Sequence, residues 1–172
     1  MTGMMLDIDL QIALPDSTKL SIYLPTIQNF EEWIRAALST QTQLSHQKPI
    51  ELTLRIVEAE ESQNLNNEYR DKQKPTNILS FPSDVPDFIS AQQETLYLGD
   101  LIICATVLLE EAQQQQKQIA HHWAHICVHG VLHLLGYDHV QEQEAEAMEG
   151  LERIILHNID VDDPYIDNTH LT

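Results

Sequence analysis

The chain contains few basic residues: nine lysines and arginines stand against 27 aspartates and glutamates, and the formal net charge is −18. Broad nonspecific binding to nucleic acid needs a cationic surface that displaces counterions, so this composition argues against it. Three of the nine basic residues, Arg70, Lys72 and Lys74, nevertheless fall within five positions. This cluster is either a solvated loop or one local positive site that attracts an anionic substrate.

Cysteines and long apolar stretches are also scarce. The two cysteines, Cys104 and Cys127, are too far apart for a metal knuckle, and we expect both to be small buried residues in a reducing compartment. No stretch approaches the roughly 20 apolar residues that cross a membrane. Residues 1–14 alternate apolar and polar positions and lack the basic start and apolar run of a signal peptide. We therefore expect a cytoplasmic protein with no membrane partner.

Length and hydrophobic periodicity predict one α+β domain over residues 1–172, which is long enough for a hydrophobic core. Alternating or apolar runs predict strands at 6–14, 50–56, 76–81 and 96–104, the last of them well inside the sheet. Helical spacing predicts helices at 29–38, 60–71, 107–118, 119–135 and 141–157. We expect a mixed sheet of about four strands packed with about five helices, and an acidic, frayed tail over residues 160–172.

Several side chains have a predicted place in these elements. Asn29, with Glu32 three residues later, is a candidate N-cap. Leu65 and Tyr69 are predicted to face inward, and residues 83–93 to form a surface loop. Trp33 and Trp123 are expected in the core. The predicted apolar face of the last helix consists of Ala145, Met148, Leu151, Ile154 and Ile155.

Six of the nine histidines lie within nineteen residues, and three of them have the spacing of a catalytic zinc site. His129 and His133 are four residues apart, so they share one face of a helix. Gly136 can end that helix in a left-handed conformation, after which His139 can turn back toward the other two. Three imidazoles around one zinc leave the fourth tetrahedral position open to water. The pattern H-x-x-x-H-x-x-G-x-x-H therefore predicts one Zn²⁺ per chain at the end of the long helix, or another divalent metal there.

Gly130 separates this pattern from that of the zinc peptidases, which place a Glu directly after the first His as general base. Asp138 could serve as base in its place, or accept a hydrogen bond from a ligand imidazole, which we favour. Gly130 itself either leaves the metal open to a bulky polynucleotide or allows close helix packing.

We do not expect the other three histidines of the cluster to bind the metal. His125 lies one turn before His129, and we expect it to be a hydrogen-bonded helix residue rather than a fourth ligand. His121 and His122 are expected in solvent.

Three motifs carry a resemblance to a known family. They are HGVLHLLGYDH at 129–139, LNNEYR and PTNILSFP within 65–82, and LGDLIIC at 98–104. Together they resemble the YbeY family of bacterial endoribonucleases. The resemblance implies a zinc enzyme, with the metal held by His129, His133 and His139, that processes the 3′ end of small-subunit (16S) rRNA and acts in ribosome quality control. It also implies RNA as substrate, ribosomal proteins or assembly factors as partners, and a role in activity for Arg70.

The residues themselves suggest how phosphodiester hydrolysis would proceed. A zinc held by three histidines can lower the pKa of its water to near 7, or polarise a phosphoryl oxygen. The attacking group is either that water or a neighbouring ribose 2′-OH, and the sequence does not choose between them. Arg70 can grip two phosphate oxygens with its planar fork, which Lys cannot do; a structural ion pair is its alternative. Two other functions remain open: a metallopeptidase of the metzincin type, and a non-catalytic assembly factor whose zinc supports folding.

The charge balance generates a first prediction, on RNA affinity. A body with a net charge of −18 should bind RNA weakly by itself, with targeting supplied by other proteins. We expect weak binding when the pure protein is titrated with a labelled random-sequence RNA across a salt series. Tight binding that weakens steeply with salt would contradict this expectation.

Overall fold

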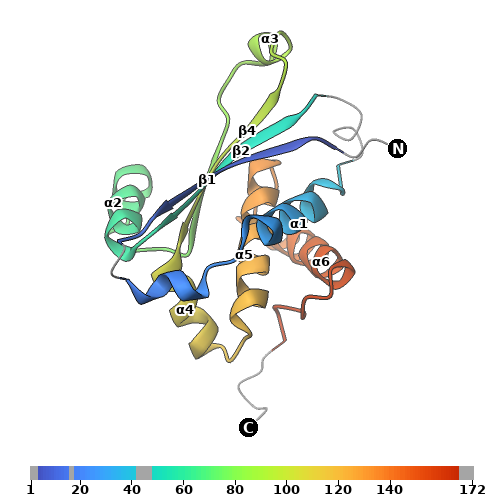
Figure 1. The fold of residues 1–172 in the computed structure, drawn as a ribbon. Helices are drawn as coiled ribbons and strands as arrows, with labels where there is room; N and C mark the ends of the chain where they lie inside the picture. The colour runs from blue at the N-terminus through green and yellow to red at the C-terminus, as the bar shows by residue number, and fades with distance from the viewer. Residues whose placement is uncertain (1–3, 16–17, 42–47, 167–172) are drawn as a thin grey trace.

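A four-stranded sheet lies at the centre of the computed structural model, which describes residues 4–15, 18–41 and 48–166 (Figure 1). The strands are β1 (Leu6–Ala13), β2 (Ile50–Val57), β3 (Ile78–Pro82) and β4 (Leu96–Cys104). Their order across the sheet is β1-β2-β4-β3; β1, β2 and β4 are parallel, and β3 is antiparallel to β4. The α+β class and the mixed four-stranded sheet are confirmed, and β4 lies in the interior as its apolar sequence predicted.

The helices include the five that the sequence predicted. These are α1 (Ile27–Leu38), α2 (Ala59–Arg70), α4 (Ala105–Gln114), α5 (Ile119–Leu134) and α6 (Glu142–Asn158). The described residues add a short 3-10 helix, η1 (Lys19–Tyr23), and a one-turn helix, α3 (Asp87–Ser90), inside the segment predicted as a loop. In the described part of the chain, none of the helices is long and apolar enough to cross a bilayer.

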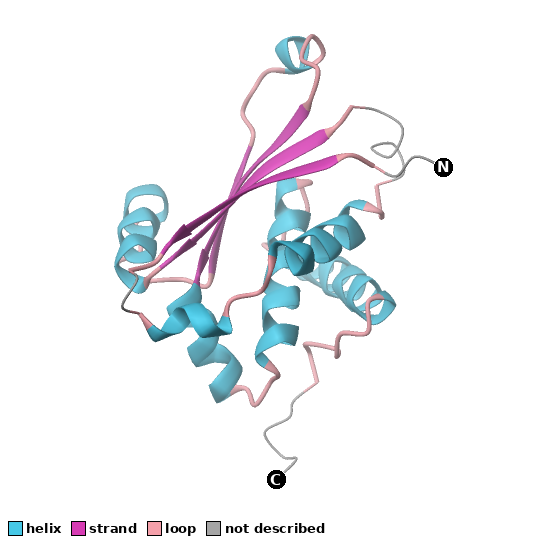
Figure 2. Cartoon of the chain, in the orientation of Figure 1, coloured by secondary structure: helices cyan, strands magenta, loops and turns pink. Residues whose placement is uncertain are grey.

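Helix α5 packs against the sheet and forms the centre of the core. In Figure 2, α1, α5 and α6 lie on one side of the sheet and α2 on the other. Leu101 and Ile103 of β4 are fully buried in the core that α5 shares, while Ile102 between them points to the α2 side. Trp33 and Trp123 are buried as predicted, and Phe30 contacts both in edge-on geometry. Both cysteines are also buried.

The N-terminus of α1 differs from the prediction. Thr26, not Asn29, is the N-cap: the Thr26 hydroxyl accepts the backbone N–H of Asn29, and the Asn29 side chain accepts the backbone N–H of Thr26. This reciprocal capping box satisfies two helix-end donors at once, and α1 starts two residues before the predicted range of 29–38.

Helix α2 buries polar rather than aromatic residues. Ser62 and Asn66 are its buried side chains, while Leu65 is half-buried and Tyr69 is 60% exposed, so the predicted inward position of Tyr69 is wrong. Ser62 accepts the backbone N–H of Thr76, and the Asn66 amide donates to the carbonyl of Lys74. These bonds attach the loop after α2 to the helix, a tertiary arrangement that periodicity does not reveal.

Gly130 lies where α5 approaches the sheet most closely. A Cβ atom built on it would stand 2.3 Å from Cδ1 of Ile78 and 3.0 Å from Cδ2 of Leu101. The hydroxyl of Ser80 on β3 donates to the Gly130 carbonyl at 3.3 Å. Of the two roles left open for this glycine, the structure supports close helix packing.

Substituting this glycine provides a test of that packing. Adding a methyl group to a filled core costs about 1–3 kcal/mol, against about 0.5–1 kcal/mol that Ala gains over Gly in a helix. We expect Gly130→Ala to lower the free energy of unfolding by about 1 kcal/mol in denaturant titrations. The matched control is Gly150→Ala on α6, where an added Cβ meets nothing within 4 Å. That variant should be more stable than the wild type, and equal effects at the two positions would contradict the packing role.

Candidate metal centre

The turn after α5 positions the candidate site. Gly136 has φ +102°, a left-handed conformation that favours glycine. The N–H of Gly136 donates to the carbonyl of His133, and the N–H of Tyr137 donates to the carbonyl of Leu132, each at 3.0 Å. This pair of bonds is a Schellman motif, which closes the helix and reverses the chain. The reversal returns His139 to the helix end, as the sequence predicted.

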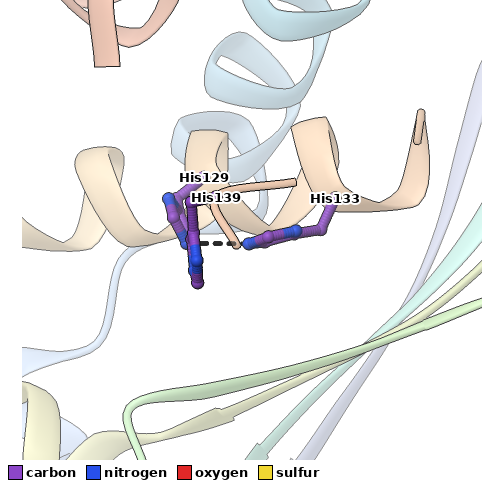
Figure 3. Close-up of side chains that lie close together, drawn as sticks. All are labelled: His129, His133 and His139. Atoms are coloured by element: carbon purple, nitrogen blue, oxygen red, sulfur yellow. Dashed lines mark hydrogen bonds between the residues drawn. The ribbon is translucent and has the colours of Figure 1, made fainter. Parts of the chain in front are cut away.

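The three predicted ligands converge. Figure 3 shows the rings of His129, His133 and His139 gathered at the end of α5. Ring centroids lie 4.5 Å apart for His129 and His133, 5.5 Å for His129 and His139, and 5.0 Å for His133 and His139. One ring nitrogen from each residue lies within 4.8 Å of the others. His139 is exposed and the other two are half-buried, so the cluster opens to solvent on one side.

Each of the two predicted ligands on α5 has a partner at its Nδ1 atom. His129 Nδ1 is 2.5 Å from Oε1 of Glu152, and His133 Nδ1 is 2.9 Å from the carbonyl oxygen of Tyr137. Burial opposes the charged form of Glu152, but hydrogen bonds from His125 and His129 outweigh it and lower the pKa of the carboxyl to about 2. The carboxylate and the carbonyl can only accept, so both histidines carry their proton on Nδ1.

In this arrangement the Nε2 lone pairs of His129 and His133 face each other. Their geometry shows whether the residues suit a metal ion. With Nδ1 protonated, the Nε2 atoms of His129 and His133 are both acceptors, yet they lie only 3.0 Å apart. Two acceptors at this distance repel each other unless a proton or a metal ion lies between them. Two nitrogens on a tetrahedral zinc are about 3.3 Å apart. Burial and the neighbouring His129 and His139 lower the pKa of His133, which keeps its lone pair free. The residues present fit a metal ion.

Glu152 contacts the histidine cluster and was not predicted from the sequence. It lies on α6 and is fully buried, whereas Ile154, predicted to face inward, is 60% exposed. The buried residues of α6 form one stripe at helical spacing: Met148, Glu152, Ile155 and Leu156. The sequence signal for Glu152 was a glutamate at a position where helical spacing places apolar residues.

His125 is the hydrogen-bonded helix residue that was predicted. Its Nε2 lies 3.0 Å from Oε2 of Glu152, and burial lowers its pKa. His125, His129 and Glu152 also form a second group whose ligand atoms are close together. The 2.5 Å between His129 Nδ1 and Glu152 is shorter than the roughly 3.3 Å between two ligands of one zinc, so a proton, not a metal, joins them.

His122 does not lie in solvent, and that prediction is wrong. Its side chain is 3% exposed, and its Nε2 lies 3.1 Å from Oε1 of Glu111 on α4. The amide of Asn77 also donates to this carboxylate. Although burial raises the pKa of Glu111, the hydrogen bonds from His122 and Asn77 lower it more. His121 is more exposed and pairs with Asp162 at 3.0 Å.

The two proposed catalytic residues, Arg70 and Asp138, are not hydrogen-bonded to the rings of the three converging histidines. Asp138 is exposed, and its Oδ1 accepts the backbone N–H of His139 at 2.7 Å, while the ligand rings are bonded to Glu152 and to Tyr137. Arg70 is exposed at the last residue of α2, before Asp71 ends the helix in a left-handed conformation. Helix α2 is on the other side of the sheet from α5 (Figure 1). The roles of Arg70 and Asp138 stay predictions.

Comparison with known proteins identifies the family. A family model described as Endoribonuclease YbeY matches residues 16–160. The protein named Endoribonuclease YbeY from Colwellia psychrerythraea is 48% identical over 160 residues, which cover 93% of this chain and 97% of that protein. The protein of the same name from Chromohalobacter salexigens is 47% identical over 159 residues, covering 92% and 97%.

A solved structure supports the fold. The solution structure of TM1509 from Thermotoga maritima matches with a TM-score of 0.51 and 19% identity, over 94% of this chain and 99% of that one. The sequence motifs and the two relatives agree on the family. The chain belongs to the YbeY endoribonuclease family.

Proposed function

We propose that this protein is a zinc-dependent endoribonuclease that cuts single-stranded RNA in rRNA maturation, including the 3′ end of 16S rRNA, and in ribosome quality control. The observation that carries the metal-dependent reaction is the convergence of three imidazoles, with the Nε2 atoms of His129 and His133 facing each other at 3.0 Å. RNA as substrate comes from the family and from the names of the two relatives.

His129, His133 and His139 would hold the metal. Three neutral nitrogen donors suit zinc, which takes imidazole ligands and keeps an open position in catalytic sites. Bound there, zinc would supply positive charge to a phosphate oxygen and lower the pKa of a water molecule. The absence of a carboxylate at position 130, where Gly130 packs on the sheet, favours a nuclease over a zinc peptidase.

Two further residues have proposed roles in catalysis. Arg70 would hold a phosphate of the bound strand with two parallel hydrogen bonds. Glu152 and the Tyr137 carbonyl already occupy the place beside His129 and His133 that was favoured for Asp138, so Asp138 takes its alternative role, proton transfer. One of its oxygens is fixed by the backbone of His139, which leaves the other available next to the metal ligand. The acidic body leaves ribosomal proteins or assembly factors to bring the enzyme to its RNA in the cytoplasm.

Metal binding gives the most direct test of the site. We expect elemental analysis of the purified protein to find about one zinc per chain, and a chelator to lower its melting temperature, because an ion that binds only the folded state stabilises it by about 2.7 kcal/mol at 100 times its Kd. His133→Ala should lose both the zinc and the response to chelator. His157→Ala, an exposed histidine on α6, is the matched control and should keep both. Zinc retained in His133→Ala would contradict the site.

Cleavage assays test the reaction. A labelled single-stranded RNA should be cut by the zinc-loaded protein, and not by His133→Ala or after chelation. We expect Arg70→Ala to lower the rate about 10- to 100-fold, since hydrogen bonds to charged groups contribute about 1.5–3 kcal/mol. Arg70→Lys should not restore it, because Lys lacks the planar fork. Lys19→Ala, which removes an exposed positive charge outside the 70–74 cluster, is the control. Cleavage of casein but not RNA would instead support a peptidase.

Mapping of rRNA 3′ ends in cells separates an enzyme from an assembly factor. Cells carrying Arg70→Ala should accumulate unprocessed 3′ ends although the variant folds normally, as shown by an unchanged melting temperature. Normal processing in those cells, together with a destabilised His133→Ala, would favour a non-catalytic factor whose metal supports folding.

A further inference from the structure

A buried carboxylate on α6 collects three hydrogen bonds behind the metal ligands. Oε1 of Glu152 faces His129 Nδ1 at 2.5 Å, and Oε2 faces His125 Nε2 at 3.0 Å. The hydroxyl of Tyr165 also donates to Oε2. Glu152 has no exposed surface, so these donors replace the water that a carboxylate otherwise requires.

Tyr165 comes from the segment after α6, where the sequence predicted a frayed tail. In the described part of this segment, Val161 packs against the core, the backbone of Asp162 bonds to His121 of α5, and Tyr165 bonds to Glu152 of α6; residues 167–172 lie outside the described part of the chain. The Tyr165 ring meets the ring of His125 edge-on at 5.5 Å, and the Arg153 guanidinium lies 5.0 Å from its centre. Asp163 accepts the backbone N–H of Tyr165 and a bond from Arg153. Tyr165 is therefore held in place by more than one contact.

The two oxygens of the Glu152 carboxylate have different partners. Oε2 is fixed by His125 and Tyr165, and this fixes the direction in which Oε1 meets His129. A carboxylate at Nδ1 keeps the proton on that nitrogen, leaves Nε2 as the ligand atom and makes the imidazole a stronger donor to a metal. Burial, and the hydrogen bond to Glu152, raise the pKa of Tyr165, so its hydroxyl remains a donor.

We propose that Glu152 is a positioning residue for the metal centre, and that the segment after α6 acts through Tyr165 to keep Glu152 in place. The inference rests on the proposed function, because it concerns the metal held by His129, His133 and His139. It adds two residues that do not touch the ion. It also gives residues 160–166, the described segment after α6, a role at the site.

The test measures metal affinity rather than activity. The zinc Kd is determined by competition with a chromophoric chelator for the wild type, Glu152→Gln and Tyr165→Phe. Loss of the hydrogen-bond partner of a ligand histidine weakens metal binding about 10- to 100-fold, and we expect this loss for Glu152→Gln. Tyr165→Phe should weaken binding by a smaller factor. The absorption bands of the Co²⁺-loaded protein should shift in both variants, because the ring of His129 changes its orientation and basicity.

Two matched controls separate this role from general stability. Glu111→Gln removes the carboxylate from another histidine pair on α5, that of His122, which touches no ligand. Tyr97→Phe removes another tyrosine hydroxyl that is bonded to a carboxylate, that of Asp100, on the sheet. Both controls should keep the wild-type Kd and Co²⁺ spectrum.

The possible outcomes are distinct. A wild-type protein that binds neither Zn²⁺ nor Co²⁺ would overturn the proposed function together with this inference. Wild-type affinity and spectrum in a folded Glu152→Gln variant would overturn the inference alone. If Glu152→Gln does not fold, Tyr165→Phe decides: an unchanged Kd and spectrum there would overturn the role of the segment and of the carboxylate it holds.

Discussion

The site depends on which face of α5 packs against the sheet, because this fixes the direction of the histidines on the other faces. One face of this helix is buried against the sheet, and Gly130 lets the backbone approach Ile78 and Leu101 so closely that a methyl group would collide. With that face fixed, the helical repeat directs His122, His125, His129 and His133 along another face, toward α4, α6 and solvent. The core therefore sets the direction of the ligands before any metal binds.

The histidines of this row differ in which ring nitrogen meets its partner. His122 and His125 use Nε2 toward Glu111 and Glu152, so the tip of each ring is occupied. His129 and His133 use Nδ1, toward Glu152 and the Tyr137 carbonyl, so the tip stays free. Residues of one type on one helix thus divide into a structural pair and a pair whose Nε2 atoms could bind a metal. The partners decide the division, and Glu152 serves one histidine of each group.

The sequence predicted what local spacing controls. The strands, the five longer helices, the left-handed Gly136 and the convergence of His129, His133 and His139 follow from periods of two and 3.6 residues and from one turn motif. Sequence patterns did not predict the contacts of side chains whose partners lie on a distant helix or strand. The burial of Glu152 and His122, and the exposure of Tyr69, depend on how α2, α4 and α6 pack. The position of Tyr165 likewise depends on a contact with His125 of α5, 40 residues earlier in the chain.

The loop from Gly136 to His139 has a kinetic consequence. It supplies His139 itself and also the carbonyl that orients His133, and three of its four residues are exposed. Exposed segments with few packing contacts open more readily than a core helix. Fraying of this one loop would detach one imidazole and release the orientation of a second in the same event. If the three histidines hold an ion as proposed, its exchange would begin at the solvent side, while His129 stays tethered to the interior through Glu152.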